Sequence, residues 1–207
     1  MFEGERKAGN GVRATRGAGQ RHRWAAVLAA GCLLASAALF GHAGWMQAKA
    51  WLAQQLIAQA WSQTLAGESR VKPWPWADTW PVARLTTPAG DRLYVLAGMT
   101  GHALAFGPAR MAASHPPGRA GSTVIAGHKD SHFRFLEGVE RGQRLRVQTP
   151  AGRVYDYRVE AVRVADSRAE RLVLDHSADE LMLITCYPFG AGDYDSPLRY
   201  VVRAVRA

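Results

Sequence analysis

The stretch that decides the fold is ELMLITCYPF, residues 180–189, an apolar run that ends in a lone cysteine, Cys186. Six consecutive strand-forming residues closed by Tyr-Pro and a glycine-containing loop are typical of a buried β-strand, whose last side chain emerges where backbone pairing stops. A thiol in that place is held rigidly and can still be reached by a substrate. Because free cysteines are also among the most buried residue types, Cys186 taken alone leaves a structural role equally open.

Two further runs place polar side chains at strand ends. TVIAGHKD, residues 123–130, is a second β-branched run, and it delivers His128 directly after a glycine. SPLRYVV, residues 196–202, begins a third strand with Arg199 near its start. The intervening loop contains residues that favour chain reversal, namely Gly190, Gly192, Asp193 and Asp195. We therefore expect the strand of Arg199 to lie antiparallel to that of Cys186, with the two residues as cross-strand neighbours.

These three residue types together can perform nucleophilic catalysis. A cysteine supplies the nucleophile, a histidine transfers protons, and an arginine offers a fixed cation to a developing oxyanion. Arg199 cannot give up its proton at neutral pH, so it is a poor base and a good oxyanion stabiliser. His128 is the expected proton donor. The rival is His132, which follows in a polar turn and is read as solvated or substrate-facing.

The same residues carry a resemblance to a known family. The Leu-Ile-Thr-Cys run, the upstream Ala-Gly-His and the downstream Leu-Arg resemble the catalytic signature of sortases, the cysteine transpeptidases that attach proteins at bacterial surfaces. Residues 72–81, KPWPWADTWP, resemble more specifically the sortase class of Gram-negative proteobacteria. The resemblance covers roughly residue 72 to the C-terminus. It implies catalytic roles for His128, Cys186 and Arg199, and an eight-stranded β-barrel fold.

The rest of the chain also indicates a mainly β domain. Eight candidate strands are separated by turns containing Gly, Pro or Asp, at residues 82–86, 92–96, 103–106, 122–126, 144–149, 153–164, 181–186 and 199–205. Short helical turns are expected at residues 108–113 and 169–172. Many short strands with few helices imply a closed barrel or a sandwich.

The N-terminal part predicts a membrane anchor. Residues 1–23 are rich in Gly and Arg without periodicity, and we expect a disordered cytoplasmic tail. Residues 24–45 are almost wholly apolar, and as a helix they would span about 32 Å, with a tryptophan at each end. The basic flank places the C-terminal part outside the cytoplasm, so the expected location is the inner membrane with a periplasmic catalytic domain. A cleaved signal peptide is the alternative, although the apolar run exceeds an ordinary signal core.

The two segments that follow connect this anchor to the catalytic domain. Residues 46–71 carry apolar side chains at helical spacing before Gly67 and predict a helical stalk. Residues 72–207 form the expected catalytic domain. Because three prolines fall within residues 72–81, that segment should lie extended over the domain, with Trp74, Trp76 and Trp80 as anchors.

Composition limits the other classes of function. The net charge of +9 comes from basic residues concentrated in the tail and scattered among acids elsewhere, without a nucleic-acid-binding motif, so no nucleic-acid partner is expected. Of the two cysteines, Cys32 lies in the apolar run, so a disulfide with Cys186 is implausible. The spacing of histidines and cysteines suggests neither a metal site nor a cofactor.

Three functions compete on this evidence. The first is a membrane-anchored transpeptidase that forms a thioacyl enzyme and passes the acyl group to an amine acceptor. The resemblance implies an exported substrate with an LPxTG-like C-terminal sorting signal. The second is an L,D-transpeptidase acting on peptidoglycan, although its typical Ser-His-Gly-Cys run is absent from the sequence around Cys186. The third is a non-catalytic periplasmic binding module, which would need no convergence of Cys, His and Arg.

Overall fold

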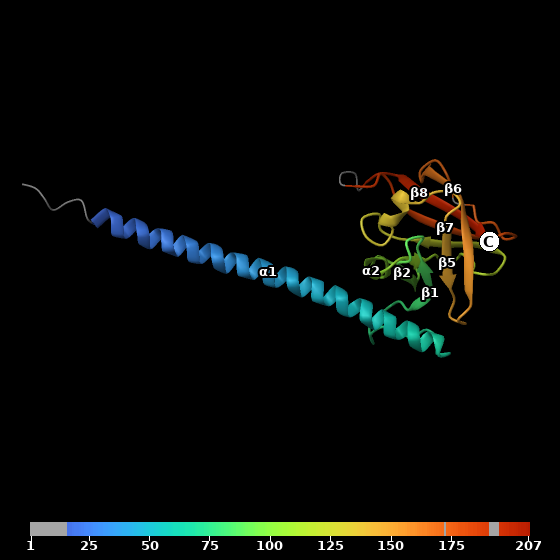
Figure 1. The fold of residues 1–207 in the computed structure, drawn as a ribbon, viewed down its shortest axis with the longest axis horizontal. Coiled ribbons are helices and arrows are strands. Elements are labelled where there is room, and N and C mark those ends of the chain that lie inside the picture. Colours follow the sequence, from blue (N-terminus) through green and yellow to red (C-terminus); the bar gives the residue numbers. More distant parts are fainter. Residues whose placement is uncertain (1–15, 172, 191–194) are drawn as a thin grey trace, which may run out of the picture. The chain divides into compact units, whose positions relative to one another are not determined.

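A computed structural model describes residues 16–171, 173–190 and 195–207, and the chain divides into two compact units, residues 1–49 and 50–207. One long helix, α1 (Arg16–Leu65), supplies residues to both units. The remaining elements all belong to the second unit (Figure 1).

The first unit consists, within the described residues, of the N-terminal part of α1. The described side chains from Arg23 to Lys49 are exposed and predominantly apolar. From Arg23 to Leu65 the helix is long and apolar enough to cross a membrane, and it lies near the N-terminus. Residues 1–15 of the predicted disordered tail lie outside the described residues. The prediction is wrong for residues 16–23, because the helix already begins at Arg16.

The C-terminal part of α1 packs within the second unit. Its buried side chains recur at helical spacing, namely Ala53, Ile57, Ala60 and Trp61. Ile57 belongs to a small apolar cluster with Leu96 and Ala109. The predicted stalk is therefore helical up to Leu65, but its residues from 50 onward are part of the second compact unit.

The segment between α1 and the first strand contains neither helix nor strand and carries three tryptophans. Trp74 packs against the cluster of Ile57, and Trp80 is half-buried, with its carbonyl accepting from Ala97 N. Trp76, by contrast, is 83% exposed. The prediction of three aromatic anchors is thus wrong for Trp76.

The second unit is built around a closed barrel of eight strands in the order β1-β2-β3-β4-β7-β8-β6-β5. The strands are β1 (Pro81–Thr86), β2 (Arg92–Ala97), β3 (Ala109–Arg110), β4 (Gly121–Ala126), β5 (Arg144–Gln148), β6 (Val154–Asp166), β7 (Asp179–Cys186) and β8 (Leu198–Arg206). Strand β7 lies between β4, to which it is parallel, and β8, to which it is antiparallel. The predicted mainly β barrel is confirmed.

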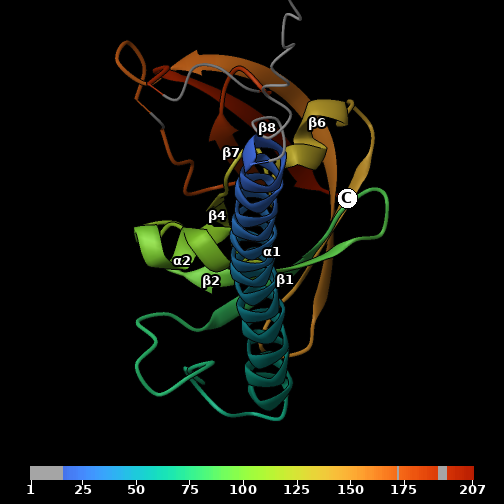
Figure 2. The same ribbon diagram turned by 90° about the vertical axis from the view of Figure 1, so that its left-hand side faces the viewer.

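One predicted strand is a helix. Residues 103–106 belong to α2 (Gly101–Phe106), which lies beside β2 in both ribbon views (Figures 1 and 2). The Thr100 side chain accepts from Ala103 N and so caps the first turn, a local signal that the strand interpretation overlooked.

The third strand lies instead at Ala109–Arg110, within the segment expected to form a helical turn. Its two residues pair with β2 and β4, so tertiary pairing decides the structure of this short segment. A 3-10 helix, η1 (Arg134–Gly138), was not expected. The helical turn expected near 169–172 lies slightly earlier, because Ala169 N and Glu170 N both donate to the carbonyl of Asp166. Residues 170 and 171 have no regular structure, and residue 172 lies outside the described residues.

The hydrophobic core lies inside the barrel and consists of inward-facing residues, which occupy alternate positions along each strand. In β7 these are Leu181 and Leu183, and in β8 they are Val202 and Ala204, all fully buried. Side chains of a strand alternate between its two faces, so the positions between them face outward. Cys186 and Arg199 belong to the outward-facing series.

Candidate active site

Cys186 is the last residue of β7, and its thiol is free and half-buried. Backbone pairing with β8 is maintained up to Cys186, whereas the ladder with β4 ends at Ile184. Thr185 Oγ1 donates to the carbonyl of Gly127 at 2.7 Å, and Gly127 N donates to the carbonyl of Ile184 at 3.2 Å. These bonds extend the contact between β4 and β7 one residue beyond Ala126 and fix the backbone that carries the thiol.

Arg199 is the direct cross-strand partner of Cys186 in the β7–β8 ladder. The prediction that Cys186 and Arg199 are cross-strand neighbours is therefore confirmed. The Arg199 Nη1 atom donates to the carbonyls of Ser196 and Leu198, each at 2.8 Å. These two bonds to its own segment hold the half-buried guanidinium group in one direction, while its remaining N–H groups can serve an incoming oxygen.

His128 follows β4 by two residues. The parallel register pairs Ala126, the last residue of β4, with Ile184. Continued for two residues past the end of β4, this register would bring His128 level with Cys186 and on the same face, and the His128 side chain is exposed. The carbonyl of His128 accepts from Phe133 N at 3.0 Å, which closes the turn after it.

Lys129 is a functional candidate that sequence reasoning passed over. Its residue is only 4% exposed, and its Nζ atom donates to the carbonyls of Pro188 at 2.8 Å and Gly190 at 3.2 Å. The ammonium group thus ties the residue after His128 to the loop after Cys186. A lysine between His128 and Asp130 has the appearance of a solvated side chain, so no signal in the sequence indicated this burial.

His132, read from the sequence as solvated or substrate-facing, is not fully solvated. It is half-buried, and its ring donates to the backbone carbonyl of Ala105 in α2. Burial lowers the pKa of His132, and the nearby His128 lowers it further, while the bond to Ala105 opposes both effects. The two histidines thus lie near one another, and His132 is the one that contacts α2.

An aromatic cluster adjoins the thiol and was not predicted. Tyr187 and Tyr200 stack with ring centroids 6.0 Å apart, and Phe189 meets Tyr200 edge-on at 5.0 Å. Burial, followed by the neighbouring Tyr187 and Glu137, raises the pKa of Tyr200. The residues immediately after Cys186 therefore offer an apolar surface.

A cavity of about 350 Å³ lies on the outer side of β6, β7 and β8. Met182 and Val201 in its walls belong to the same outward-facing rows as Cys186 and Arg199, although neither Cys186 nor Arg199 lines it. Charged side chains also line it, namely Arg163, Glu170, Arg171 and Arg203. A volume of this size can hold a few residues of an extended peptide. Among the described residues, no group of three or more His, Cys, Asp or Glu side chains is arranged to hold a metal ion.

Comparison with known proteins defines the class. The family model described as Sortase domain matches residues 85–207, more than half of the chain, and the chain belongs to the sortase family. A curated relative, Sortase D from Bacillus subtilis (strain 168), is 32% identical over 94 residues, which are 45% of this chain and 46% of that protein. The chain thus spans about half the length of this curated relative.

Solved structures agree on the fold. Sortase A from Corynebacterium diphtheriae is 22% identical, with a TM-score of 0.56 over 75% of this chain and 84% of that one. The pilus-related Sortase C of Group B Streptococcus is also 22% identical, with a TM-score of 0.52 over 61% of this chain and 67% of that one. At such identities the likeness establishes a sortase fold, and the roles of individual side chains remain predictions.

Proposed function

We propose that this protein is a sortase-type cysteine transpeptidase in which His128, Cys186 and Arg199 carry the chemistry. The single observation that supports this best is the register of three adjacent strands: β8 sets Arg199 opposite Cys186, and β4 runs parallel to β7 so that His128 follows level with the thiol. A nucleophile, a proton donor and a fixed cation thereby share one face.

In the proposed reaction, the thiolate of Cys186 attacks the carbonyl carbon of a peptide bond. Arg199 stabilises the negative charge that develops on the carbonyl oxygen, and protonated His128 gives its proton to the departing amine as the C–N bond breaks. A thioester between Cys186 and the new carboxyl end remains. An incoming amine then attacks the thioester carbon, releases the thiolate, and returns a proton to His128.

The proposed substrate is an exported protein with an LPxTG-like C-terminal sorting signal. The cavity beside Met182 and Val201 supports binding of an extended peptide on this face, with apolar side chains against Met182 and Val201 and polar groups near the charged residues that also line it. The acceptor is an amine whose identity the fold does not specify. A peptidoglycan substrate is the rival and has no separate observation in its favour.

We further propose that the N-terminal part of α1 anchors the enzyme in the inner membrane, with the N-terminus in the cytoplasm and the catalytic unit in the periplasm. The apolar helix near the N-terminus and the basic residues before it support this arrangement. A reporter enzyme that is active only outside the cytoplasm, fused after Ala207, should be active, and the protein should stay in membranes after carbonate washing. Appearance in the soluble periplasmic fraction would indicate a cleaved leader instead.

The catalytic proposal is tested with the full chain in detergent. Incubation with a peptide bearing an LPxTG-like signal should add the mass of its N-terminal part to Cys186, detected by mass spectrometry, and an added amine should discharge the adduct. Cys186→Ala should show neither adduct nor product, since it removes the thiol paired across the strands with Arg199, and the other cysteine, Cys32, belongs to the N-terminal apolar helix. Acylation by a peptidoglycan stem peptide, but not by the sorting peptide, would overturn the substrate assignment and favour an L,D-transpeptidase.

A further inference from the structure

A second cavity, of about 380 Å³, lies at a different part of the barrel, and no residue of the candidate active site lines it. Its walls come from the start of β1, from β3, from the loop before β4, and from the turn between β5 and β6. Three arginines line it, Arg110, Arg119 and Arg153, and no acidic residue does. The remaining walls are mainly apolar and include two prolines from the loop before β4 and the ring of Tyr155.

The three guanidinium groups have no carboxylate counter-ion in this part of the structure. None of them lies within salt-bridge distance of an acidic side chain among the described residues, although other arginines of the barrel, such as Arg146 and Arg203, are paired. Arg110 is half-buried, and its Nη1 atom donates to the neutral carbonyl of Ser114 at 2.7 Å. Burial accordingly lowers the pKa of Arg110. A cation buried without a counter-ion is unfavourable, and an anion in the cavity would relieve that cost.

The loop that carries Arg119 is preorganised. Gly118 has φ of 78°, and a Cβ atom there would lie 2.1 Å from the ring of Tyr155, so the backbone rests directly on the aromatic face. Gly118 N also donates to Tyr157 Oη at 3.0 Å. On the other side of the cavity, Arg153 lies over the Tyr155 ring at 5.5 Å from its centroid. A binding site whose walls are already fixed loses little entropy when it is filled.

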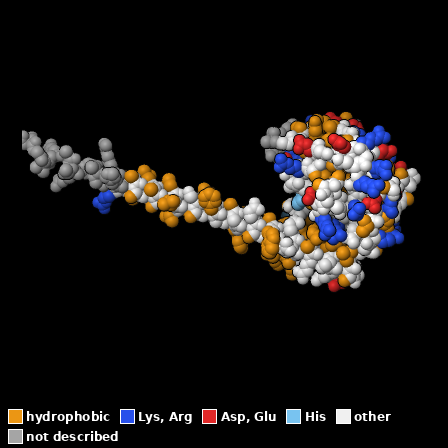
Figure 3. Space-filling view, in the orientation of Figure 1, with side chains coloured by type: hydrophobic (Ala, Val, Ile, Leu, Met, Phe, Trp, Pro, Cys, Tyr) orange, Lys and Arg blue, Asp and Glu red, His pale blue; other side chains and the backbone are white. Residues whose placement is uncertain are grey.

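We propose that this cavity binds an oxyanion, a phosphate or carboxylate, carried on a sugar-sized body. The arginines would hold the anionic group through charge-assisted hydrogen bonds, and the proline walls would contact the ring, since Tyr155 is only 8% exposed. The cavity is larger than a bare phosphate needs and lies within the ordinary range for small ligands. Lys and Arg side chains also gather over β5 and β6 with fewer acids between them, which would attract an anion to this side (Figure 3).

The test uses the full chain in phosphatidylcholine nanodiscs, titrated calorimetrically with glucose 1-phosphate. We expect saturable binding with a dissociation constant on the order of 0.1–1 mM, which is ordinary for a few charge-assisted contacts. Glucose itself should give no saturable heat. The Arg119→Gln, Arg153→Gln double variant should weaken binding at least about tenfold, because each lost contact to a charged group is worth roughly 1.5–3 kcal/mol.

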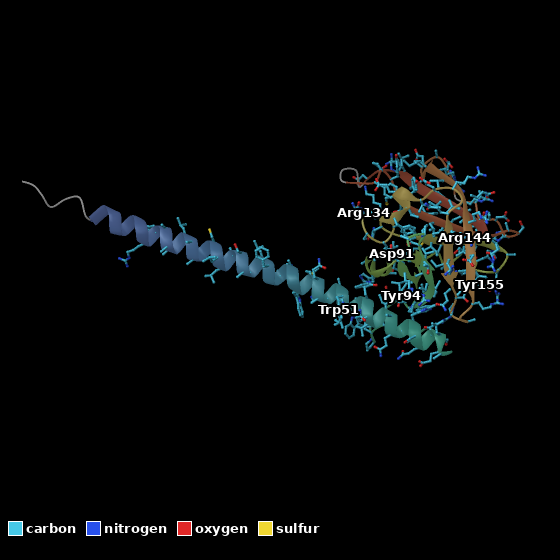
Figure 4. The ribbon with its side chains drawn as sticks, in the orientation of Figure 1. Trp51, Asp91, Tyr94, Arg134, Arg144 and Tyr155 are labelled. Carbon is cyan, nitrogen blue, oxygen red and sulfur yellow. The ribbon has the colours of Figure 1, made fainter. Side chains whose placement is uncertain are left out.

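The double variant changes two exposed side chains, so its fold should be unaffected. The matched control is Arg144→Gln, which removes an equally exposed arginine of β5 outside the cavity; Figure 4 labels both Arg144 and Tyr155 on this side of the barrel. Equal affinity in the wild type and the double variant, or equal heats with glucose and glucose 1-phosphate, would overturn the proposal.

A further arm identifies where the phosphate comes from. In nanodiscs that contain phosphatidic acid, loss of glucose 1-phosphate binding would support the site and identify a lipid headgroup as its occupant. Unchanged binding would support the site with a soluble or polymer-borne anion. Cys186→Ala should bind glucose 1-phosphate as the wild type does, since the two sites share no residue.

Discussion

Two groups of ionisable side chains lie at opposite ends of the outer face of β4, β7 and β8. They differ in whether each charged side chain has an opposite charge beside it. At the N-terminal end of β7, the Glu180 side chain is 2% exposed and accepts hydrogen bonds from Ser122 Oγ and, at 2.7 Å, from Arg203 Nε. Arg203 Nη1 reaches Glu160 at 2.6 Å. The pKa of Arg203 is raised, and the hydrogen bond to Glu180 is the largest cause. Every charge in this group therefore has an opposite charge beside it.

At the other end of the same strands, His128, Cys186 and Arg199 are exposed or half-buried, and no salt bridge involves them within the described residues. Within the part of the chain that the structure describes, Arg199 is held by the neutral carbonyls of Ser196 and Leu198. A guanidinium group restrained in this way keeps its charge available to a substrate, whereas that of Arg203 is already neutralised. This difference supports the proposal that the end with His128, Cys186 and Arg199 carries the chemistry, whereas the paired charges at the other end stabilise the barrel.

The largest effect on activity short of losing the thiol is expected from the histidine. His128→Ala should reduce acyl-enzyme formation by about 10²- to 10⁴-fold, the usual contribution of a positioned proton donor. His132→Gln should keep most of the activity, because an amide can still donate to the carbonyl of Ala105. Single-turnover kinetics on a sorting peptide measure both. If the two variants exchange these effects, His132 is the proton donor and the register argument for His128 fails.

Arg199→Lys should have the next largest effect. Lysine keeps the charge but loses the planar group whose several donors can approach an oxygen from a fixed direction. Removing one oxyanion donor costs about 2.7–4 kcal/mol, on the order of a hundred- to a thousandfold in rate. Alkylation of Cys186 by a small thiol reagent should be nearly unchanged. Wild-type turnover of peptide by Arg199→Lys would make Arg199 an ordinary surface residue and remove the distinction from Arg203.

Much of this arrangement could be predicted because it depends on local patterns. The alternation and β-branched content of residues 123–126 and 181–186 specify strands, and the turn residues after Cys186 specify an antiparallel return. The neighbourhood of Cys186 and Arg199 follows from these features. The strands near the site and the antiparallel pairing of β7 with β8 could therefore be predicted from the sequence. The closed barrel was predicted from the family resemblance.

What could not be predicted depends on contacts between distant segments. Residues 109 and 110 become a strand only because β2 and β4 offer partners on both sides. The burial of Lys129 depends on carbonyls about sixty residues further along the chain, as the sequence separation of 59 to Pro188 shows. The contact between His132 and Ala105 likewise requires α2, which was itself mistaken for a strand. Side-chain pattern carries no information on such pairings.

Lys129 permits a third test. Its side chain is buried, like that of Glu180, but it lies next to His128 in the chain. Lys129→Met keeps an unbranched side chain but removes the donors to the carbonyls of Pro188 and Gly190, so the loop after Cys186 should loosen. As a positioning residue, Lys129 should affect kcat more than KM, with a loss of about ten- to a hundredfold from misplacement of reacting groups. Lys129→Arg, which retains donors, should recover part of the rate.

The matched control is Lys72→Met, which removes an exposed lysine before the barrel and should leave kinetics unchanged. Limited proteolysis supplies a second measurement: the loop after Cys186 should be cut faster in Lys129→Met than in the wild type or in Lys72→Met. Equal rates of both cleavage and turnover in all three proteins would show that the bonds of Lys129 do not restrain the site.

Glu180→Gln should have the smallest effect on activity and the clearest effect on stability. Glutamine keeps the shape and can still accept from Ser122, but among the described residues it leaves Arg203 with Glu160 as its only carboxylate within salt-bridge distance. Loss of a charged hydrogen bond to a buried group should lower the free energy of unfolding by about 1–3 kcal/mol.

Glu160→Gln is the matched control, because that carboxylate pairs with the same arginine but its side chain is 42% exposed. This variant should lower the free energy of unfolding by at most about 1 kcal/mol. Urea unfolding measures both variants, and kcat/KM on the sorting peptide should stay within about twofold of wild type for each, since neither carboxylate lines the cavity proposed for the peptide. A large loss of turnover in Glu180→Gln without loss of stability would mean that the compensated end also takes part in the reaction, and the division between the two ends of the face would have to be abandoned.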